Sequence, residues 1–231
     1  MKKLYNLVRK ITTYKSFRSS SENYWRNTAS KYSEHYSKEF PGRLKKQMKL
    51  IEENIFRLNK SDKVLDLACA DGFVAEFLSP HVREVIGIDI SEDAIYNAEL
   101  KAREKGITNI KYFVEDLLNK KEFDEVFNNI FCLGLFTCIE KNQNFSKILK
   151  ICFNSMFEGG FIFLKDTIHY GQKDLKIHNN FIGSYYRTKK NYISVVENYF
   201  EIVEISSIEK KHFVEEFQSE FESIFIVARK K

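Results

Sequence analysis

The chain has 231 residues, of which 43% are hydrophobic and 30% charged, and this composition is typical of a globular protein with a sizeable core. Two prolines and no apolar run near ~18 residues exclude a proline-rich scaffold and a transmembrane helix. The net charge of +5 comes from residues 1–20, which hold six basic side chains and no acid, whereas the rest of the chain is nearly neutral. Proteins that bind nucleic acid usually carry a basic stripe across the body, so we do not expect a nucleic-acid partner.

Residues 1–21 are predicted to form a basic N-terminal arm that ends at a run of three serines. Apolar residues recur between the basic ones at roughly helical spacing, which leaves three interpretations open. The arm packs over the body, lies on anionic lipid as an amphipathic helix, or serves as a transit peptide. We favour the first, so membrane contact through residues 1–20 is an alternative. A secretory signal is excluded because no uninterrupted apolar segment follows the first lysines.

Residues 22–60 are predicted to form a helical cover. A polar, tyrosine-rich helix is expected at 22–39, and a second helix follows Pro41 with apolar residues at spacings of three, four and seven. Aromatic side chains of the first helix could roof a binding site, although packing between helices is their more common role. They are Tyr24, Trp25, Tyr32, His35 and Tyr36.

From residue 61 to 231 the pattern changes to strands alternating with helices, with an insert at about 166–188. Strands are expected at 64–68, 85–89, 110–114, 125–133, 161–164, 201–206 and 223–228, and helices at 73–78, 91–105, 142–157 and 188–199. Ser91 is expected to cap the second of these helices, and Gly159-Gly160 to end the third. Continuous apolar strands alternating with helices indicate a Rossmann-like, doubly wound α/β fold. We expect a mostly parallel, seven-stranded sheet with an N-terminal helical cover.

Four cysteines are present, with no C-x-x-C pair and no histidine at metal-ligand spacing: Cys69, Cys132, Cys138 and Cys152. We interpret them as buried, reduced thiols, which predicts a cytoplasmic location and no metal site.

Acidic residues follow three consecutive predicted strands. Asp66 opens a turn of small residues that ends at Gly72, Asp89 ends the second strand, and Glu115-Asp116 follow the third. Ligands of open α/β sheets bind beyond the carboxyl ends of the strands, where small residues let the backbone approach and an acid can accept ribose hydroxyls. One such acid would be an ordinary helix cap, but three at consecutive strands favour a nucleoside site.

Over residues 22–231 the chain resembles the class I S-adenosylmethionine-dependent methyltransferases. The likeness rests on segments 64–72 (VLDLACADG), 85–91 (VIGIDIS), 113–116 (FVED), 123–127 (FDEVF) and 149–164 around the glycine pair. The sequence departs from the family's alternating glycines, because Ala68 and Ala70 stand where glycine is typical and only Gly72 remains. The same departure excludes the dinucleotide fingerprint, which requires glycines at fixed offsets.

The resemblance implies S-adenosylmethionine as cofactor, S-adenosylhomocysteine as product, and a set of binding residues. Asp66 and the backbone of Ala68 and Ala70 would face the methionine part, and Gly72 would close the turn. Asp89 would hold the ribose. The adenine side would consist of Ile90, which packs on the ring, Asp116, which accepts from its amino group, and the adjacent Leu117. Cys132 would offer its backbone to the methionine amine, although it is equally consistent with ordinary strand core.

Catalytic residues are less clearly marked. His169 is the first candidate for a general base, because it follows the fifth strand closely, and Asp166 is the second. Packing is the alternative role for His169, and a turn at the strand end for Asp166. Many small-molecule members carry a histidine where this chain has Cys138. A base is not obligatory, because the sulfonium is already activated and positioning supplies much of the acceleration.

We expect the acceptor to be a small molecule, of sugar, nucleotide-sugar or natural-product type, methylated on oxygen or nitrogen. Residues 128–131 lack the prolines of base-methylating enzymes of the (N/D)-P-P-(Y/F) type, and no Pro-Cys pair is present for attack on a cytosine ring. An RNA or protein methyltransferase is the first alternative. A non-catalytic nucleoside-binding or membrane-associated protein with a degenerate methyltransferase fold is the second. The sequence does not determine the acceptor or the oligomeric state.

Overall fold

The computed structural model describes residues 34, 37–38, 40–178 and 183–231. The predicted arm at 1–21 and nearly all of the helix predicted at 22–39, including its aromatic residues, lie outside the described residues.

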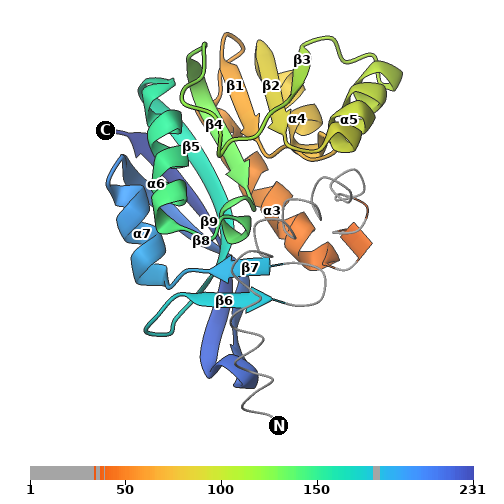
Figure 1. Cartoon of the computed structure of the whole chain (residues 1–231). Helices are drawn as coiled ribbons and strands as arrows, with labels where there is room; N and C mark the ends of the chain where they lie inside the picture. Colours follow the sequence, from red (N-terminus) through yellow and green to blue (C-terminus); the bar gives the residue numbers. More distant parts are fainter. Residues whose placement is uncertain (1–33, 35–36, 39, 179–182) are drawn as a thin grey trace.

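A seven-stranded sheet in the order β3-β2-β1-β4-β5-β9-β8 forms the centre of the protein (Figure 1). Its strands are β1 (Lys63–Leu67), β2 (Glu84–Asp89), β3 (Ile110–Val114), β4 (Phe127–Leu133), β5 (Met156–His169), β8 (Phe200–Val214) and β9 (Ser219–Lys230). The first five are mutually parallel, and β9 is antiparallel to both of its neighbours. The predicted fold class, a mostly parallel and doubly wound seven-stranded sheet, is confirmed.

Helices cover both faces of this sheet, as the continuous apolar strands require. One face carries α3 (Pro41–Glu53), α4 (Phe73–Leu78) and α5 (Glu92–Glu104), packed in one hydrophobic cluster. The other carries α6 (Asn142–Asn154) and α7 (Lys189–Glu197), packed in a second cluster. The predicted cap is present, because the Ser91 hydroxyl accepts a hydrogen bond from the backbone N–H of Ala94 at 3.3 Å.

The expectation that Gly159-Gly160 end a helix is wrong. Helix α6 already ends at Asn154, and both glycines lie inside β5. The pairing of β5 with β4 shifts register between Phe127 and Asn129, and Gly159 has φ of +77° at this irregularity. The glycines therefore shape a β-bulge, which needs a left-handed residue as much as a helix end does.

The last strands are longer than predicted. Strand β5 has 14 residues instead of four, and β8 and β9 form a hairpin of 15 and 12 residues. The outer part of β5, residues 165–169, is mostly polar although it is largely buried. The hairpin strands mix polar with apolar residues, because an antiparallel hairpin can face water on one side. A search for apolar runs therefore detects only the inner parts of these strands. The predicted insert holds a separate antiparallel pair, β6 (Leu175–His178) and β7 (Gly183–Tyr186), which was not predicted.

All four cysteines are free, and three of them are buried. Among the described residues, no helix is both long and apolar enough to cross a membrane. The described residues also contain no group of three or more histidine, cysteine, aspartate or glutamate side chains that could hold a metal ion.

Candidate functional site

A pocket that is partly open to solvent lies at the carboxyl end of β1. Helix α3 forms one wall, the loop after β1 and the start of α4 form another, and β4 contributes one residue. Its lining consists of Leu44, Gln47, Asp66, Ala68, Cys69, Ala70, Asp71, Phe73, Val74 and Leu133. The pocket therefore lies where ligands of open α/β sheets bind, beyond the strand ends, and α3 from the predicted helical cover closes its side.

The loop after β1 has a glycine-like backbone although it contains alanine. Ala68 has φ of +61°, Ala70 of +47° and Gly72 of +79°. A left-handed conformation costs a residue with a Cβ about 1–2 kcal/mol, so each alanine is under local strain. The departure from the alternating glycines thus leaves the backbone path intact and adds two methyl groups to the pocket wall.

Alanine occupies two of the three left-handed positions of this loop, 68 and 70, but there is no room for it at Gly72. A Cβ built on it would lie closer than 3.0 Å to the hydroxyl of Tyr112 and to Cβ of Ala98. Tyr112 is buried on β3, and its ring also fills the space above Gly87 of β2. The remaining glycine of the loop is therefore required both by its φ and by the close approach of β3 and α5.

Asp66, at the end of β1, lines the pocket with its carboxylate. The side chain is 2% exposed, and its Oδ2 has no hydrogen-bond partner. Burial, with a contribution from Asp89, raises the pKa of Asp66 to about 7, and a backbone hydrogen bond from Ala75 opposes the rise. A buried carboxylate oxygen without a partner is costly, so this atom is available for a donor from a ligand.

Asp89, at the end of β2, fixes the shape of the loop. One carboxylate oxygen accepts the N–H of Ala70 and the other the N–H of Ser91, both at 2.9 Å. Burial raises its pKa, while these backbone hydrogen bonds oppose the rise. Each oxygen keeps a second lone pair, so the carboxylate can still accept from a ligand hydroxyl. Its carbonyl accepts the N–H of Glu115, which joins the segment after β3 to the same edge.

The predicted adenine-side residues flank this edge without lining the pocket. Ile90, Asp116 and Leu117 are half-buried. The carboxylate of Asp116 accepts the N–H of Leu118 at 2.9 Å and the side-chain amide of Asn119 at 2.7 Å. The structure thus brings Asp66, Ala68, Ala70, Gly72 and Asp89 into one contiguous group, with the adenine-side residues beside it. The role of each toward a cofactor stays a prediction.

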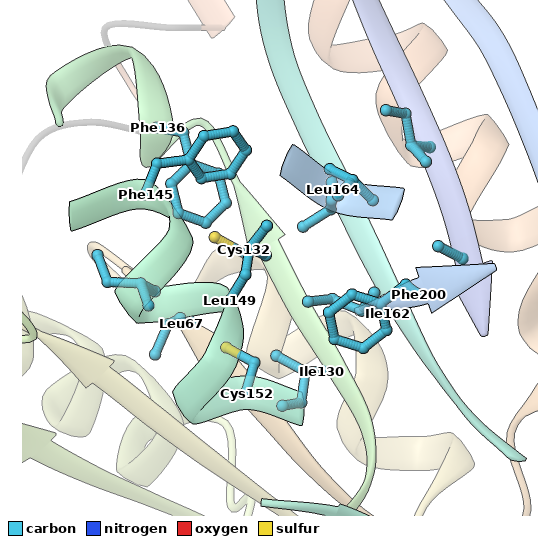
Figure 2. Packing of buried hydrophobic residues seen from close by; sticks show 14 of the residues in the cluster. Leu67, Ile130, Cys132, Phe136, Phe145, Leu149, Cys152, Ile162, Leu164 and Phe200 are labelled. Carbon is cyan, nitrogen blue, oxygen red and sulfur yellow. The ribbon is translucent and has the colours of Figure 1, made fainter. Parts of the chain in front are cut away.

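Cys132 lies with its side chain in the hydrophobic core, away from the pocket. It is fully buried, and Figure 2 shows its sulfur among the side chains of Phe136, Phe145 and Leu149. Burial raises the pKa of its thiol well above the ordinary value. The next residue, Leu133, lines the pocket instead. The assignment of the Cys132 backbone to a ligand amine stays a prediction.

Asp166 lies inside β5 and not at a strand end, on the face covered by α6 and α7. Its carboxylate accepts the Tyr192 hydroxyl at 2.8 Å and the Thr137 N–H at 3.1 Å. Burial raises its pKa to about 6, and the hydrogen bond from Tyr192 and the charge of Lys165 oppose the rise. Because both oxygens have partners, Asp166 is held as a packing element.

His169 is the last residue of β5 and is 1% exposed. Its Nδ1 accepts the N–H of Gly171 at 3.1 Å and lies 3.1 Å from the hydroxyl of Ser219, and its ring stacks on Phe221. Burial lowers its pKa, an effect that Asp174 opposes. It lies four residues beyond Lys165, the partner of Leu133, which is roughly 13 Å further along the strand. Neither His169 nor Asp166 lines the pocket, and their catalytic role stays a prediction.

Several residues that line the pocket were not predicted. Leu44 lies in the helix predicted after Pro41, and Leu133 ends the strand predicted at 125–133. The sequence does not mark Gln47, Phe73 or Val74 as site residues. The signal for Gln47 is that it interrupts the apolar inner face of α3, and this signal has meaning only once α3 is known to close a pocket.

The chain is similar to known methyltransferases in sequence and in structure. Residues 64–160 match the family model described as a methyltransferase domain. A ubiquinone biosynthesis O-methyltransferase of Acinetobacter baylyi is 30% identical over 109 residues, which cover 44% of this chain and 42% of the relative. An uncharacterized RNA methyltransferase of Chlorobaculum tepidum is 36% identical over 62 residues, or 27% and 13% of the two chains. The chain thus spans less than half the length of these curated relatives.

Solved structures show the same fold over most of the chain. The complex of DhpI with S-adenosylhomocysteine superposes with a TM-score of 0.70 at 15% identity and covers 93% of this chain and 97% of that one. An S-adenosylmethionine-dependent methyltransferase of Clostridium acetobutylicum gives 0.67 at 19% identity, with 88% and 99% covered. At these identities the likeness concerns the fold.

Proposed function

We propose that this chain, whose residues 64–160 match the family model of a methyltransferase domain, transfers a methyl group from S-adenosylmethionine to an oxygen or nitrogen atom of a small molecule. The observation that carries the cofactor assignment is the unpartnered Oδ2 of Asp66, which is buried in a pocket beside a glycine-like loop. A cationic amine would satisfy this atom, and the adjacent Asp89 retains lone pairs for ribose hydroxyls. The residues present therefore fit the cofactor.

The bound sulfonium would supply an activated methyl group, so the protein has to position the acceptor and exclude water. The side chains available for this are apolar: Leu44 from α3, Phe73 from α4 and Leu133 from β4 all line the pocket. The acceptor atom would also have to give up a proton, either to a group of the protein or to water. An unprotonated amine needs no base for this, whereas a hydroxyl benefits from one.

A small-molecule acceptor is supported by the longer of the two sequence likenesses, which is to an O-methyltransferase of ubiquinone biosynthesis. Likeness to RNA methyltransferases covers about a quarter of the chain, and an RNA acceptor is the alternative. Transfer of labelled methyl from S-adenosylmethionine into fractionated small-molecule and polymer pools of the native cell tests both. Label in the small-molecule pool supports the proposal, and label in RNA or protein overturns the acceptor class.

Calorimetry with S-adenosylmethionine tests the cofactor assignment directly. Absence of binding to the folded protein at millimolar S-adenosylmethionine would overturn the assignment as a methyltransferase. Asp89→Ala should lose most of the affinity, because the carboxylate fixes the Ala70 N–H of the pocket wall and retains lone pairs for ribose hydroxyls. Circular dichroism checks that the variant is folded. Unchanged affinity in Asp89→Ala would remove this residue from the site.

His169 remains the first candidate for a base, and Asp166 the second. In His169→Ala, turnover should fall while cofactor affinity is retained. Full activity of this variant would assign the role to Asp166, to another group or to no base at all.

A further inference from the structure

Gln47 is a buried polar residue on an apolar helix face. It is 6% exposed, and its neighbours on the inner side of α3, Leu50 and Ile51, are 3% and 1% exposed. In the described part of the chain, no hydrogen bond is made by its side-chain amide. The amide atoms are not among the fully buried atoms that lack a partner, so they are accessible from the pocket that Gln47 lines. Packing alone would favour an aliphatic residue here, so the amide points to a ligand.

The pocket offers few other donors. Among the described residues that line it, Gln47 has the only side chain with an N–H group. Three loop amides are already used: Cys69 donates to the carbonyl of Ile88, Ala70 to the carboxylate of Asp89, and Gly72 to the carbonyl of Cys69. An anionic ligand group that enters this pocket would find the Gln47 amide beside the first backbone N–H groups of α4, which have no partner within the helix.

The same pocket offers one carboxylate for a cationic group. Asp71 also lines it, but its carboxylate forms an ion pair with Lys101 at 2.7 Å. Asp66 has the unpartnered oxygen. A carboxylate oxygen without a partner on Asp66 and a side-chain donor on Gln47, on the walls of a single pocket, match the ammonium and the carboxylate of an amino acid.

We propose that Gln47 binds the carboxylate of the amino-acid end of S-adenosylmethionine, while Asp66 binds the ammonium. This inference rests on the proposed function and deepens it. It assigns a cofactor-selecting residue to α3, which lies outside residues 64–160 of the methyltransferase domain. The cover thus recognises the cofactor in addition to closing the pocket.

The test compares two sulfonium ligands, S-adenosylmethionine and its decarboxylated analogue, which lacks only the carboxylate. The wild-type protein should bind S-adenosylmethionine at least tenfold more tightly. In Gln47→Leu, affinity for S-adenosylmethionine should fall by about tenfold to a hundredfold, the effect expected for a hydrogen bond to a charged group. Affinity for the analogue should change by less than about twofold, so that the preference disappears.

Gln143→Leu is the matched control, because Gln143 is exposed on α6 and outside the pocket. It should leave both affinities unchanged. Gln47→Glu keeps the size of the side chain and carries the test if Gln47→Leu does not fold. Its added carboxylate should weaken S-adenosylmethionine binding further than leucine does, while binding of the analogue is retained.

Equal losses for both ligands in the Gln47 variants would overturn the inference, because they would indicate a packing role. Unchanged affinities would overturn it as well, since the carboxylate would then bind elsewhere. A wild-type protein that binds neither ligand would overturn the proposed function itself. If the wild-type protein binds S-adenosylmethionine and Gln47→Leu binds it equally well, the inference about Gln47 is overturned while the proposed function stands.

Discussion

Asp66 and Asp166 are two fully buried aspartates on opposite faces of one sheet. Burial raises the pKa of the first to about 7 and of the second to about 6. Asp66 has an oxygen without a partner and lines a pocket, whereas both oxygens of Asp166 accept hydrogen bonds from the protein. Burial and a raised pKa are therefore shared by a ligand-facing group and a packing group. The unsatisfied atom separates them.

The largest effect is expected where the loop that carries Asp66 meets β3. Gly72→Ala would place a Cβ against Tyr112 and Ala98 in a left-handed conformation. We expect a loss of about 3 kcal/mol or more of unfolding free energy, from overpacking and strain together. Gly106→Ala is the control, because Gly106 has φ of +66° but open space around it, and it should cost about 1 kcal/mol. Denaturant unfolding measures both, and equal losses would show that strain alone requires Gly72.

Asp66→Asn should separate stability from binding. The folded-state pKa of about 7 lies above the unfolded value of 3.8, so the contribution of this group to stability falls as pH rises from about 4 to about 7. Removal of the ionisable group should stabilise the protein at pH 8 by on the order of 2–4 kcal/mol, with little change near pH 4. Cofactor affinity should be lost at pH 8, where Asp66 is ionised, and should change little at pH 4, where the wild-type carboxyl is protonated as well. Chemical unfolding at pH 4 and pH 8 and calorimetry check the two parts.

Tyr192→Phe should have the opposite pattern. It removes the hydroxyl that donates to Asp166, leaving a buried carboxylate oxygen without that partner. We expect a loss of about 1–3 kcal/mol at pH 8. The loss should be smaller below pH 6, where the carboxyl is protonated. Cofactor affinity should be unchanged, and a variant that lost binding while keeping its stability would move Asp166 into the site.

The smallest effect is expected for Ala68→Gly. Glycine relieves the strain at φ of +61° but increases the entropy of the unfolded chain, so the two terms nearly cancel. Stability should change by less than about 1 kcal/mol. Cofactor affinity should change by less than about threefold if the added methyl group only lines the wall. A tenfold gain in affinity would show that the methyl group narrows the site.

The two halves of the sheet differ in how closely the sequence predicts their strands. Strands β1, β2 and β3 begin and end within about one residue of the prediction, because each is a short apolar run bounded by polar residues. The acids that follow them converge because parallel strands end at one edge. Strand β5 was predicted at 161–164 and runs from Met156 to His169, since polar residues in its outer part are satisfied by β9 and the helices.

The sequence by itself determined the fold class, the strand-end acids and the glycine loop, since these depend on local spacing and on the rule that strand ends meet. Only the tertiary structure decided which buried polar groups lack a partner. The sequence around Asp166 is as suggestive as that around Asp66, yet Thr137 and Tyr192 reach its two oxygens from distant elements. Gln47 gains its interest only because α3 packs beside β1. Hydrogen-bond satisfaction is a property of contacts between segments far apart in the chain, and no single segment encodes it.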